Sequence, residues 1–236
     1  MPPDPASAVA IKVGMEIFTR VTPRGFAWIK SKWVGRDLLV VGQARAGKTS
    51  LVRYIQYGVF AEQETTRTRT VKKTAAFSVK VGRDKSLALE VRKAIDTVGQ
   101  VSAEAHAGLA KTYKPHAILV VIDMSGAWES KDDNNARHYL EEFFEYLSST
   151  YQKSRSLKRK LKAVYIVANK RDRVDPKRAS SFLKKMNEFV RSKQQAKFGV
   201  DTIDCYVLES SLVEAFDEGK SANNVIQKLA LKLNEG

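Results

Sequence analysis

The sequence predicts an α/β protein with a mainly parallel sheet that is covered by helices on both faces. Three observations support this fold class. Apolar strands alternate with helical segments, the segments 38–42, 116–124 and 161–170 are apolar almost throughout, and one hairpin pattern interrupts the alternation. With 236 residues the chain is long enough for one large core. We therefore expect a three-layer α/β/α fold with a six-stranded, mainly parallel sheet and one antiparallel edge strand.

The expected elements follow one another along two regions of the chain. Residues 1–36 form an N-terminal extension, in which 8–21 fits a helix or a strand and 26–33 is aromatic and amphipathic. Residues 37–236 form the main domain, where 61–73 is expected to be a polar loop. The strands expected in this domain are 38–42, 75–81, 86–95, 116–124, 161–170 and 201–210, and the expected helices are 48–57, 136–151, 176–194 and 221–233.

Composition restricts the compartment and the kind of partner. The formal charge of +15 favours an anionic partner, such as nucleic acid, an acidic membrane surface or an acidic protein. A single cysteine excludes an intramolecular disulfide and suits a reducing compartment. The N-terminus does not resemble a secretory signal, and there is no apolar run of about 18 residues to span a bilayer. We expect a cytoplasmic protein, with peripheral attachment to a membrane as an alternative.

The segment from Gly42 to Thr49, GQARAGKT, matches the pattern G-x-x-x-x-G-K-[ST] between an apolar strand and a helix. Glycines let the backbone turn so that successive N–H groups point at phosphate oxygens, and the helix N-terminus adds partial positive charge. Lys48 can reach the β- and γ-phosphates, and the Thr49 hydroxyl can bind Mg²⁺. The chain is therefore expected to be a P-loop NTPase.

A second motif, Asn169-Lys170-Arg171-Asp172, follows a later apolar strand and favours guanine. The Asp172 carboxylate can accept the N1–H and the exocyclic N2–H of guanine, two donors that adenine lacks at that edge. Such a site rejects an analogue without these donors, because binding the analogue would leave the buried carboxylate unpaired. The Lys170 stem can cover the base, Asn169 can tie this loop to the phosphate loop, and backbone N–H groups of residues 210–212 can contact the guanine carbonyl.

A third motif, Asp96-Thr97-Val98-Gly99-Gln100, lies at the end of the second hairpin strand. Asp96 can hold Mg²⁺ through water, the Gly99 N–H can bond the γ-phosphate, and Gln100 can orient the attacking water. A further Mg²⁺ ligand is expected from the preceding loop. Thr70 is the first choice there, with Thr68 second and Thr66 third.

In this order the motifs resemble the Ras-like small GTPases, and the phosphate loop is most similar to the Arf-like branch. The resemblance covers residues 37–233. It implies slow GTP hydrolysis that toggles two loops, with Gln100, Lys48 and Arg67 in the catalytic set and Thr49, Thr70 and Asp96 as Mg²⁺ ligands. Arg67 resembles the built-in arginine of heterotrimeric G-protein α subunits. The nucleotide-binding residues are then Gly42, Ala44, Arg45, Ala46, Gly47, Lys48, Thr49, Ser50, Gly99, Asn169, Lys170, Asp172, Ser210, Ser211 and Leu212.

The expected function is a guanine-nucleotide switch that binds GTP or GDP with Mg²⁺ and signals to a protein effector, assisted by a GTPase-activating partner. The alternatives are an RNA- or membrane-associated GTPase and a non-hydrolysing module like the SRP-receptor β subunit. Arg45, which stands where many relatives have glycine, keeps the last alternative open. The basic segment 152–162 reads first as a solvated loop, and otherwise as a contact for an acidic protein, phospholipid or RNA. Sequence-specific DNA binding is not expected.

Overall fold

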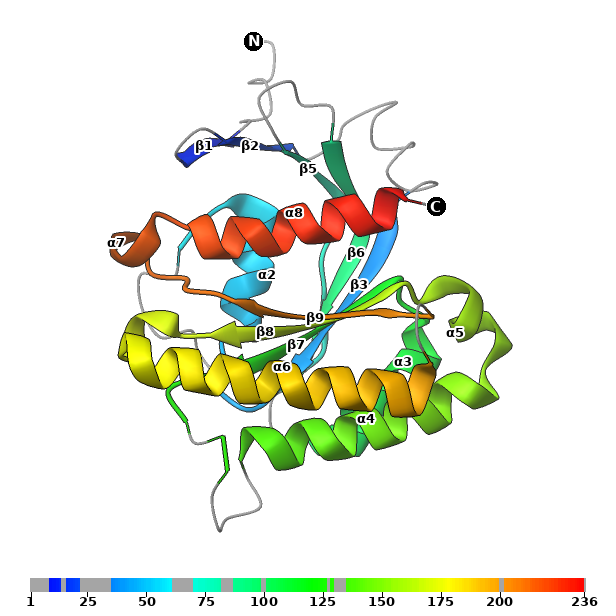
Figure 1. Ribbon diagram of the computed structural model, residues 1–236. Helices are drawn as coiled ribbons and strands as arrows, with labels where there is room; N and C mark the ends of the chain where they lie inside the picture. The colour runs from blue at the N-terminus through cyan, green and yellow to red at the C-terminus, as the bar shows by residue number, and fades with distance from the viewer. Residues whose placement is uncertain are drawn as a thin grey trace.

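The computed structural model describes most of the chain. The described residues are 9–13, 16–21, 35–60, 70–81, 87–98, 101–126, 128–129, 135–199 and 202–235. Figure 1 shows a twisted sheet that runs through the middle of the molecule, with helices above and below it. The aromatic segment 26–33 and the hairpin turn 82–85 lie outside the described residues, and so do Arg67, Gly99 and Gln100.

The strands of the described residues form one mixed sheet. They are β1 (Val9–Val13), β2 (Glu16–Val21), β3 (Arg36–Gly42), β4 (Lys72–Lys73), β5 (Phe77–Val81), β6 (Leu87–Asp96), β7 (Ala117–Asp123), β8 (Ala163–Asn169) and β9 (Asp204–Glu209). The sheet order is β1-β2-β5-β6-β3-β7-β8-β9, and β4 also pairs with β6. The neighbours from β6 through β3, β7 and β8 to β9 are parallel, whereas the pairings of β1, β2, β4 and β5 are antiparallel.

The helices begin and end at residues that suit those positions. They are α2 (Lys48–Tyr57), α3 (Ala103–Tyr113), α4 (Ala136–Lys153), α5 (Arg155–Lys160), α6 (Pro176–Phe198), α7 (Glu214–Asp217) and α8 (Lys220–Asn234). The Asn135 side chain caps α4, and the Asp175 side chain caps α6 just before Pro176. Gly58 ends α2 in the left-handed conformation.

Successive residues of the parallel strands face two separate cores. Leu38 and Val40 pack with α2 and α8 on one side of the sheet, and Leu39 and Val41 pack with α3, α4 and α6 on the other. Every residue of β8 is buried, as helices on both faces of a parallel sheet require. The α/β class and the helical layers on both faces are therefore confirmed.

The sheet is larger than the six-stranded sheet predicted from the sequence. The six expected strands correspond to β3 and β5 to β9, but β5 is not an edge strand, because β2 pairs along its outer side and β1 pairs with β2. An uncovered edge would expose unpaired backbone N–H and C=O groups, and β2 pairs with residues 78–80 of β5. Within the ambiguous segment 8–21, the described residues 9–13 and 16–21 are thus strands and not a helix, and the predicted loop 61–73 contains β4.

Three helices were not predicted, namely α3, α5 and α7. The prediction of a solvated loop for 152–162 is wrong, because this segment completes α4 and forms α5. Two leucines of this segment, Leu157 and Leu161, are buried, at 0% and 1% exposure. Their burial holds the short helix α5 against the rest of the domain.

Candidate functional site

The predicted site residues follow the carboxyl ends of neighbouring parallel strands. The loop 42–49 follows β3, Asp96 ends β6, Asp123 ends β7 and Asn169 ends β8. Parallel strands place these ends at one edge of the sheet, the edge toward which the arrowhead of β8 points in Figure 1. Residues far apart in the sequence therefore meet at the place where open α/β sheets bind ligands.

Two glycines of the loop 42–49 occupy positions that exclude a side chain. Gly42 has φ 138°, and a Cβ there would lie 2.1 Å from the Val121 carbonyl oxygen of β7. Gly47 has φ 97°, and a Cβ there would lie 2.3 Å from Nδ2 of Asn169. Arg45 also has a positive φ, 59°, and its side chain is exposed. The loop thus leaves the sheet in a tight, partly left-handed turn against β7 and Asn169.

Lys48, the first residue of α2, folds back over this loop. Its Nζ donates hydrogen bonds to the carbonyl oxygens of Gly42, at 2.9 Å, and Gln43, at 2.7 Å. Burial lowers the pKa of Lys48 to about 8, and the neighbouring Asp96 partly opposes this shift. Because both hydrogen-bond acceptors are neutral carbonyls, an anion in the loop would stabilise the ammonium further.

Thr49 and Asp96 form a polar pair beside Lys48. The Thr49 hydroxyl donates to Oδ2 of Asp96 at 2.7 Å, while the buried Oδ1 of Asp96 has no hydrogen-bond partner among the described residues. Burial raises the pKa of Asp96, and the contacts with Thr49 and Lys48 oppose this effect. A hydroxyl and a carboxylate are ligands that Mg²⁺ accepts when phosphate and water complete its shell, so these residues fit such an ion. No group of three or more His, Cys, Asp or Glu suited to a metal occurs in the described part of the chain.

Thr70, the expected switch threonine, lies two residues before β4, the short strand that pairs with the end of β6. It is exposed and precedes β4, in which Lys72 pairs with Asp96. The chain at Thr70 therefore approaches the end of β6 where Asp96 lies. Thr66 and Thr68, the third and second choices, lie outside the described residues.

The second loop of the site, 169–172, is tied to the first by a direct hydrogen bond. Asn169 Nδ2 donates to the Ala46 carbonyl oxygen at 2.8 Å, and its buried Oδ1 has no partner among the described residues. Lys170 has a positive φ of 64°, and its Nζ lies 2.6 Å from Oδ2 of Asp123. The end of β8 therefore lies directly against the loop that follows β3.

A third loop, 210–212, follows β9 and contacts the second. The Ser211 hydroxyl donates to Oδ1 of Asp172 at 2.8 Å, and the Arg171 N–H donates to the Ser210 carbonyl oxygen at 3.2 Å. Ser210 is fully buried, and its hydroxyl has no partner within the described residues. Leu212 Cδ1 lies 4.0 Å from the position of a Cβ on Gly47. All three predicted loops thus meet at one edge of the sheet.

The structure brings most of the predicted site residues together, but some of them lie outside the described residues. The structure brings together the loop 42–49, Asp96, the loop 169–172 and the loop 210–212, with Ala44 exposed and Ser50 half-buried in the first turn of α2. It does not describe Arg67, Gly99 or Gln100.

Three buried polar residues near the site were not predicted. The Thr97 hydroxyl donates to the Val40 carbonyl oxygen at 2.9 Å, and His106 and Tyr139 hydrogen-bond one another at 2.8 Å. The spacing of Tyr139 along α4 resembles an ordinary core position, and a scattered histidine has no motif. Thr97 lies within the motif 96–100 but was given no role there, and no local signal in the sequence identifies His106 or Tyr139.

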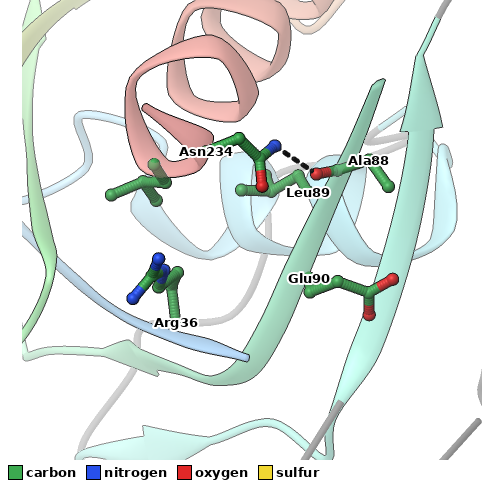
Figure 2. Close-up of a pocket in the computed structure, with 6 residues that line it drawn as sticks. Arg36, Ala88, Leu89, Glu90 and Asn234 are labelled. Carbon is green, nitrogen blue, oxygen red and sulfur yellow. Dashed lines mark hydrogen bonds between the residues drawn. The ribbon is translucent and has the colours of Figure 1, made fainter. Parts of the chain in front are cut away.

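A small cavity lies away from these loops, between the start of β6 and the end of α8. Its lining includes Arg36, Leu89 and Asn234, and its volume of about 40 Å³ leaves room for roughly one water molecule, not a nucleotide. Figure 2 shows the Asn234 side chain above this space, where its Nδ2 donates to the Ala88 carbonyl oxygen at 2.7 Å. This cavity plays no part in the candidate site.

The basic segment 152–162 lies at the opposite end of the parallel strands, just before β8 begins, and α5 is visible there in Figure 1. Its exposed cations include Arg155, Lys158 and Arg159, and none of the three forms an ion pair within the described residues. Lys158 lies over the ring of the buried Tyr151, at 6.0 Å from its centroid. By contrast, Lys193 of α6 is paired with Glu141 of α4.

Comparison with known proteins does not assign the chain to a family. No protein-family model matches the sequence, and a search of curated proteins finds no significant similarity. Within the described residues, no helix is both long and apolar enough to cross a membrane.

Proposed function

We propose that this protein is a guanine-nucleotide-binding switch that binds GTP and GDP with Mg²⁺ and hydrolyses GTP slowly. One observation carries the proposal. Among the described residues, three of the four buried side-chain polar atoms without a partner are Asp96 Oδ1, Asn169 Oδ1 and the Ser210 hydroxyl, all at the predicted site. Buried polar atoms are rarely left unpaired in native proteins, so a polar ligand is the simplest missing partner.

Each loop then has a distinct role toward the nucleotide. The N–H groups of the loop 42–49 and the N-terminus of α2 hold the phosphates, and the Lys48 ammonium neutralises their charge. Thr49 and Asp96, with Thr70, hold Mg²⁺, which supplies Lewis-acid stabilisation of the phosphate charge when it is bound. Asp172 accepts hydrogen bonds from the N1–H and N2–H of guanine. Asn169 holds the loop 169–172 against the loop 42–49 through its hydrogen bond to Ala46. Arg67 and Gln100 complete the proposed catalytic set.

The experiment that tests this proposal exchanges the base specificity. Wild-type protein is expected to bind GDP and to discriminate against ADP by about 10⁴-fold, because ADP leaves the Asp172 carboxylate unpaired. Asp172→Asn replaces one acceptor with a donor, which suits xanthine, a base with a carbonyl where guanine has its amino group. We therefore expect this variant to lose GDP binding and to gain binding of xanthosine diphosphate, as measured by isothermal titration calorimetry.

Ser211→Ala is the matched control, because it removes the hydroxyl that donates to Asp172 but keeps the carboxylate. It should weaken GDP binding only modestly and should not favour xanthosine diphosphate. Preference of the wild-type protein for ADP, or an unchanged base preference in Asp172→Asn, would contradict the proposal. Turnover of GTP by the purified protein then separates a slow GTPase from a module that binds without hydrolysis.

A second candidate function, binding of a polyanion in addition to the nucleotide, is favoured by the basic segment. Its buried leucines leave no apolar side chain exposed for insertion into a bilayer, and the buried Tyr151 is not free to stack on bases. Contact through charge alone, as with the phosphate backbone of RNA, suits such a surface better. In this alternative the protein is an RNA-associated GTPase whose nucleotide site and basic surface lie at opposite ends of the sheet.

A further inference from the structure

A buried chain of hydrogen bonds runs from Tyr139 of α4 through His106 of α3 to the segment that follows β6. The Tyr139 hydroxyl of α4 lies 2.8 Å from Nδ1 of His106 in α3, and Nε2 of His106 lies 2.8 Å from the Val98 carbonyl oxygen. Burial raises the pKa of the Tyr139 hydroxyl, and the backbone of Gly42, which faces the same hydroxyl, opposes this shift. His106 is fully buried and Tyr139 is 9% exposed, so solvent does not replace these bonds.

Only one arrangement of protons satisfies the whole chain. The Val98 carbonyl can only accept, so Nε2 of His106 must carry a proton and donate. In the neutral ring Nδ1 is then an acceptor, and the Tyr139 hydroxyl donates to it, which leaves the tyrosine oxygen as an acceptor toward the Gly42 backbone. Burial lowers the pKa of His106 to about 4, so the ring is neutral near pH 7.

The Val98 peptide is significant because of its place in the sequence. It lies between Asp96, a proposed Mg²⁺ ligand, and Gly99, whose N–H is proposed to bond the γ-phosphate. A trans peptide is planar, so a hydrogen bond that holds the Val98 carbonyl restricts the orientation of the entire peptide unit. His106 thus constrains the segment that leads into the proposed switch, and Tyr139 ties this constraint to the phosphate loop.

We propose that His106 and Tyr139 are positioning residues that orient the Val98 peptide relative to the phosphate loop and so give the site its preference for a nucleotide with a γ-phosphate. This inference rests on the proposed guanine-nucleotide function. Preorganisation of a binding segment lowers the entropic cost of ordering it on binding. The benefit should appear for GTP and not for GDP, because only GTP carries the phosphate that the ordered segment would meet.

The test compares the affinities for GDP and for the slowly hydrolysed analogue GTPγS in the full-length protein. Tyr139→Phe removes the hydroxyl and keeps the ring, whereas His106→Met removes both ring nitrogens. Each variant is expected to weaken GTPγS binding about tenfold, the cost of one lost buried hydrogen bond, and to leave GDP binding unchanged. The double variant should behave like either single variant, because both changes break the same chain.

Two further variants distinguish positioning from general stability. His106→Gln keeps an N–H that can donate to the Val98 carbonyl, so it should retain most of the GTPγS affinity that His106→Met loses. Tyr165→Phe removes another buried tyrosine hydroxyl, which donates to the Lys228 carbonyl oxygen far from the site, and should leave the ratio of the two affinities at the wild-type value.

The possible outcomes separate this inference from the function on which it rests. A wild-type protein that binds neither nucleotide would refute the proposed function and this inference together. A wild-type protein that binds both nucleotides, with variants that weaken GDP and GTPγS by the same factor or by none, would refute the inference alone.

Discussion

At the scale of single residues, the backbone of the candidate site is unusual where the motifs are. Arg45 and Lys170 are two of the four non-glycine residues with positive φ in the described part of the chain, and both belong to predicted loops of the site. Left-handed backbone at such residues costs free energy, and outside helix C-caps it often marks a functional site. The other two residues, Lys114 and Glu218, are the C-caps of α3 and α7, so the left-handed residues that do not end a helix lie where the nucleotide is proposed to bind.

Glycine substitutions test this view of the phosphate loop. Gly42→Ala would place a Cβ against the Val121 carbonyl oxygen of β7, and we expect it to lower the free energy of unfolding by about 3 kcal/mol. A Cβ at Gly108, within α3, would meet no atom within 4 Å, so Gly108→Ala should raise stability by about 0.5–1 kcal/mol through helix propensity. Urea unfolding of the two variants measures the contrast. Equal effects would show that Gly42 is not sterically constrained.

At the scale of elements, the helices that sequence patterns missed have weak or masked signals. The buried face of α3 is formed by Ala103, His106, Ala107 and Ala110, small or polar residues that produce little hydrophobic periodicity. Its one clear signal is Ser102, whose side chain caps the helix by accepting from the Ala105 N–H. In α5, the surrounding cations obscure the pattern of its two buried leucines, Leu157 within the helix and Leu161 at its C-cap. Such helices depend on tertiary packing, which a local pattern does not contain.

The cations of α5 make the second candidate function testable. If the basic surface binds the phosphate backbone of RNA, Lys158→Gln with Arg159→Gln should weaken binding to a duplex RNA. These changes should also reduce the slope of log Kd against log salt by about 2, because each lost phosphate contact releases one counterion less. Filter binding over a series of salt concentrations gives this slope.

The matched control is Lys193→Gln with Lys197→Gln, two lysines of α6 that pair with Glu141 and Glu145 of α4. This variant should change the slope little. Equal losses in both variants would point to net charge and not to α5. Binding to vesicles of phosphatidylserine in preference to RNA would favour a membrane surface as the partner.

At the scale of the whole molecule, two histidines make folding sensitive to acid. Burial lowers the pKa of His106 and of His116 to about 4, and Asp37 only partly opposes the shift at His116. His116 Nδ1 accepts from the Asp37 N–H at 3.0 Å and joins the starts of β7 and β3, a role that a protonated ring cannot play. Both rings are therefore neutral in the folded protein at neutral pH.

The direction of the pH effect follows from these shifts. The unfolded chain takes up protons on both histidines below about pH 6.5, whereas the folded protein does so only near pH 4. Stability should be complete above the unfolded pKa and should fall as the pH drops from about 6.5 to 4, by at most about 1.4 kcal/mol per pH unit for each histidine. Urea unfolding at pH 7.5, 6.5 and 5.5 measures the slope.

His116→Gln retains an acceptor for the Asp37 N–H but does not titrate, so it should make the dependence on pH shallower. His138→Gln, at a half-exposed side chain of α4, is the matched control and should leave the slope unchanged. The same slope in all three proteins would show that other groups dominate acid unfolding.

The sequence by itself determined the class of the fold, the six strands with apolar or alternating patterns, and the positions of the loops 42–49 and 169–172. These follow from local rules, because buried parallel strands must be apolar and a tight turn at Gly42 and Gly47 needs glycine. Only the tertiary structure decided that β2 covers the edge of β5 and that Asn169 bonds Ala46. It also decided that Tyr139, His106 and Val98 form one chain. Those contacts join residues distant in sequence, so they depend on the order in which strands and helices pack, which no local pattern encodes.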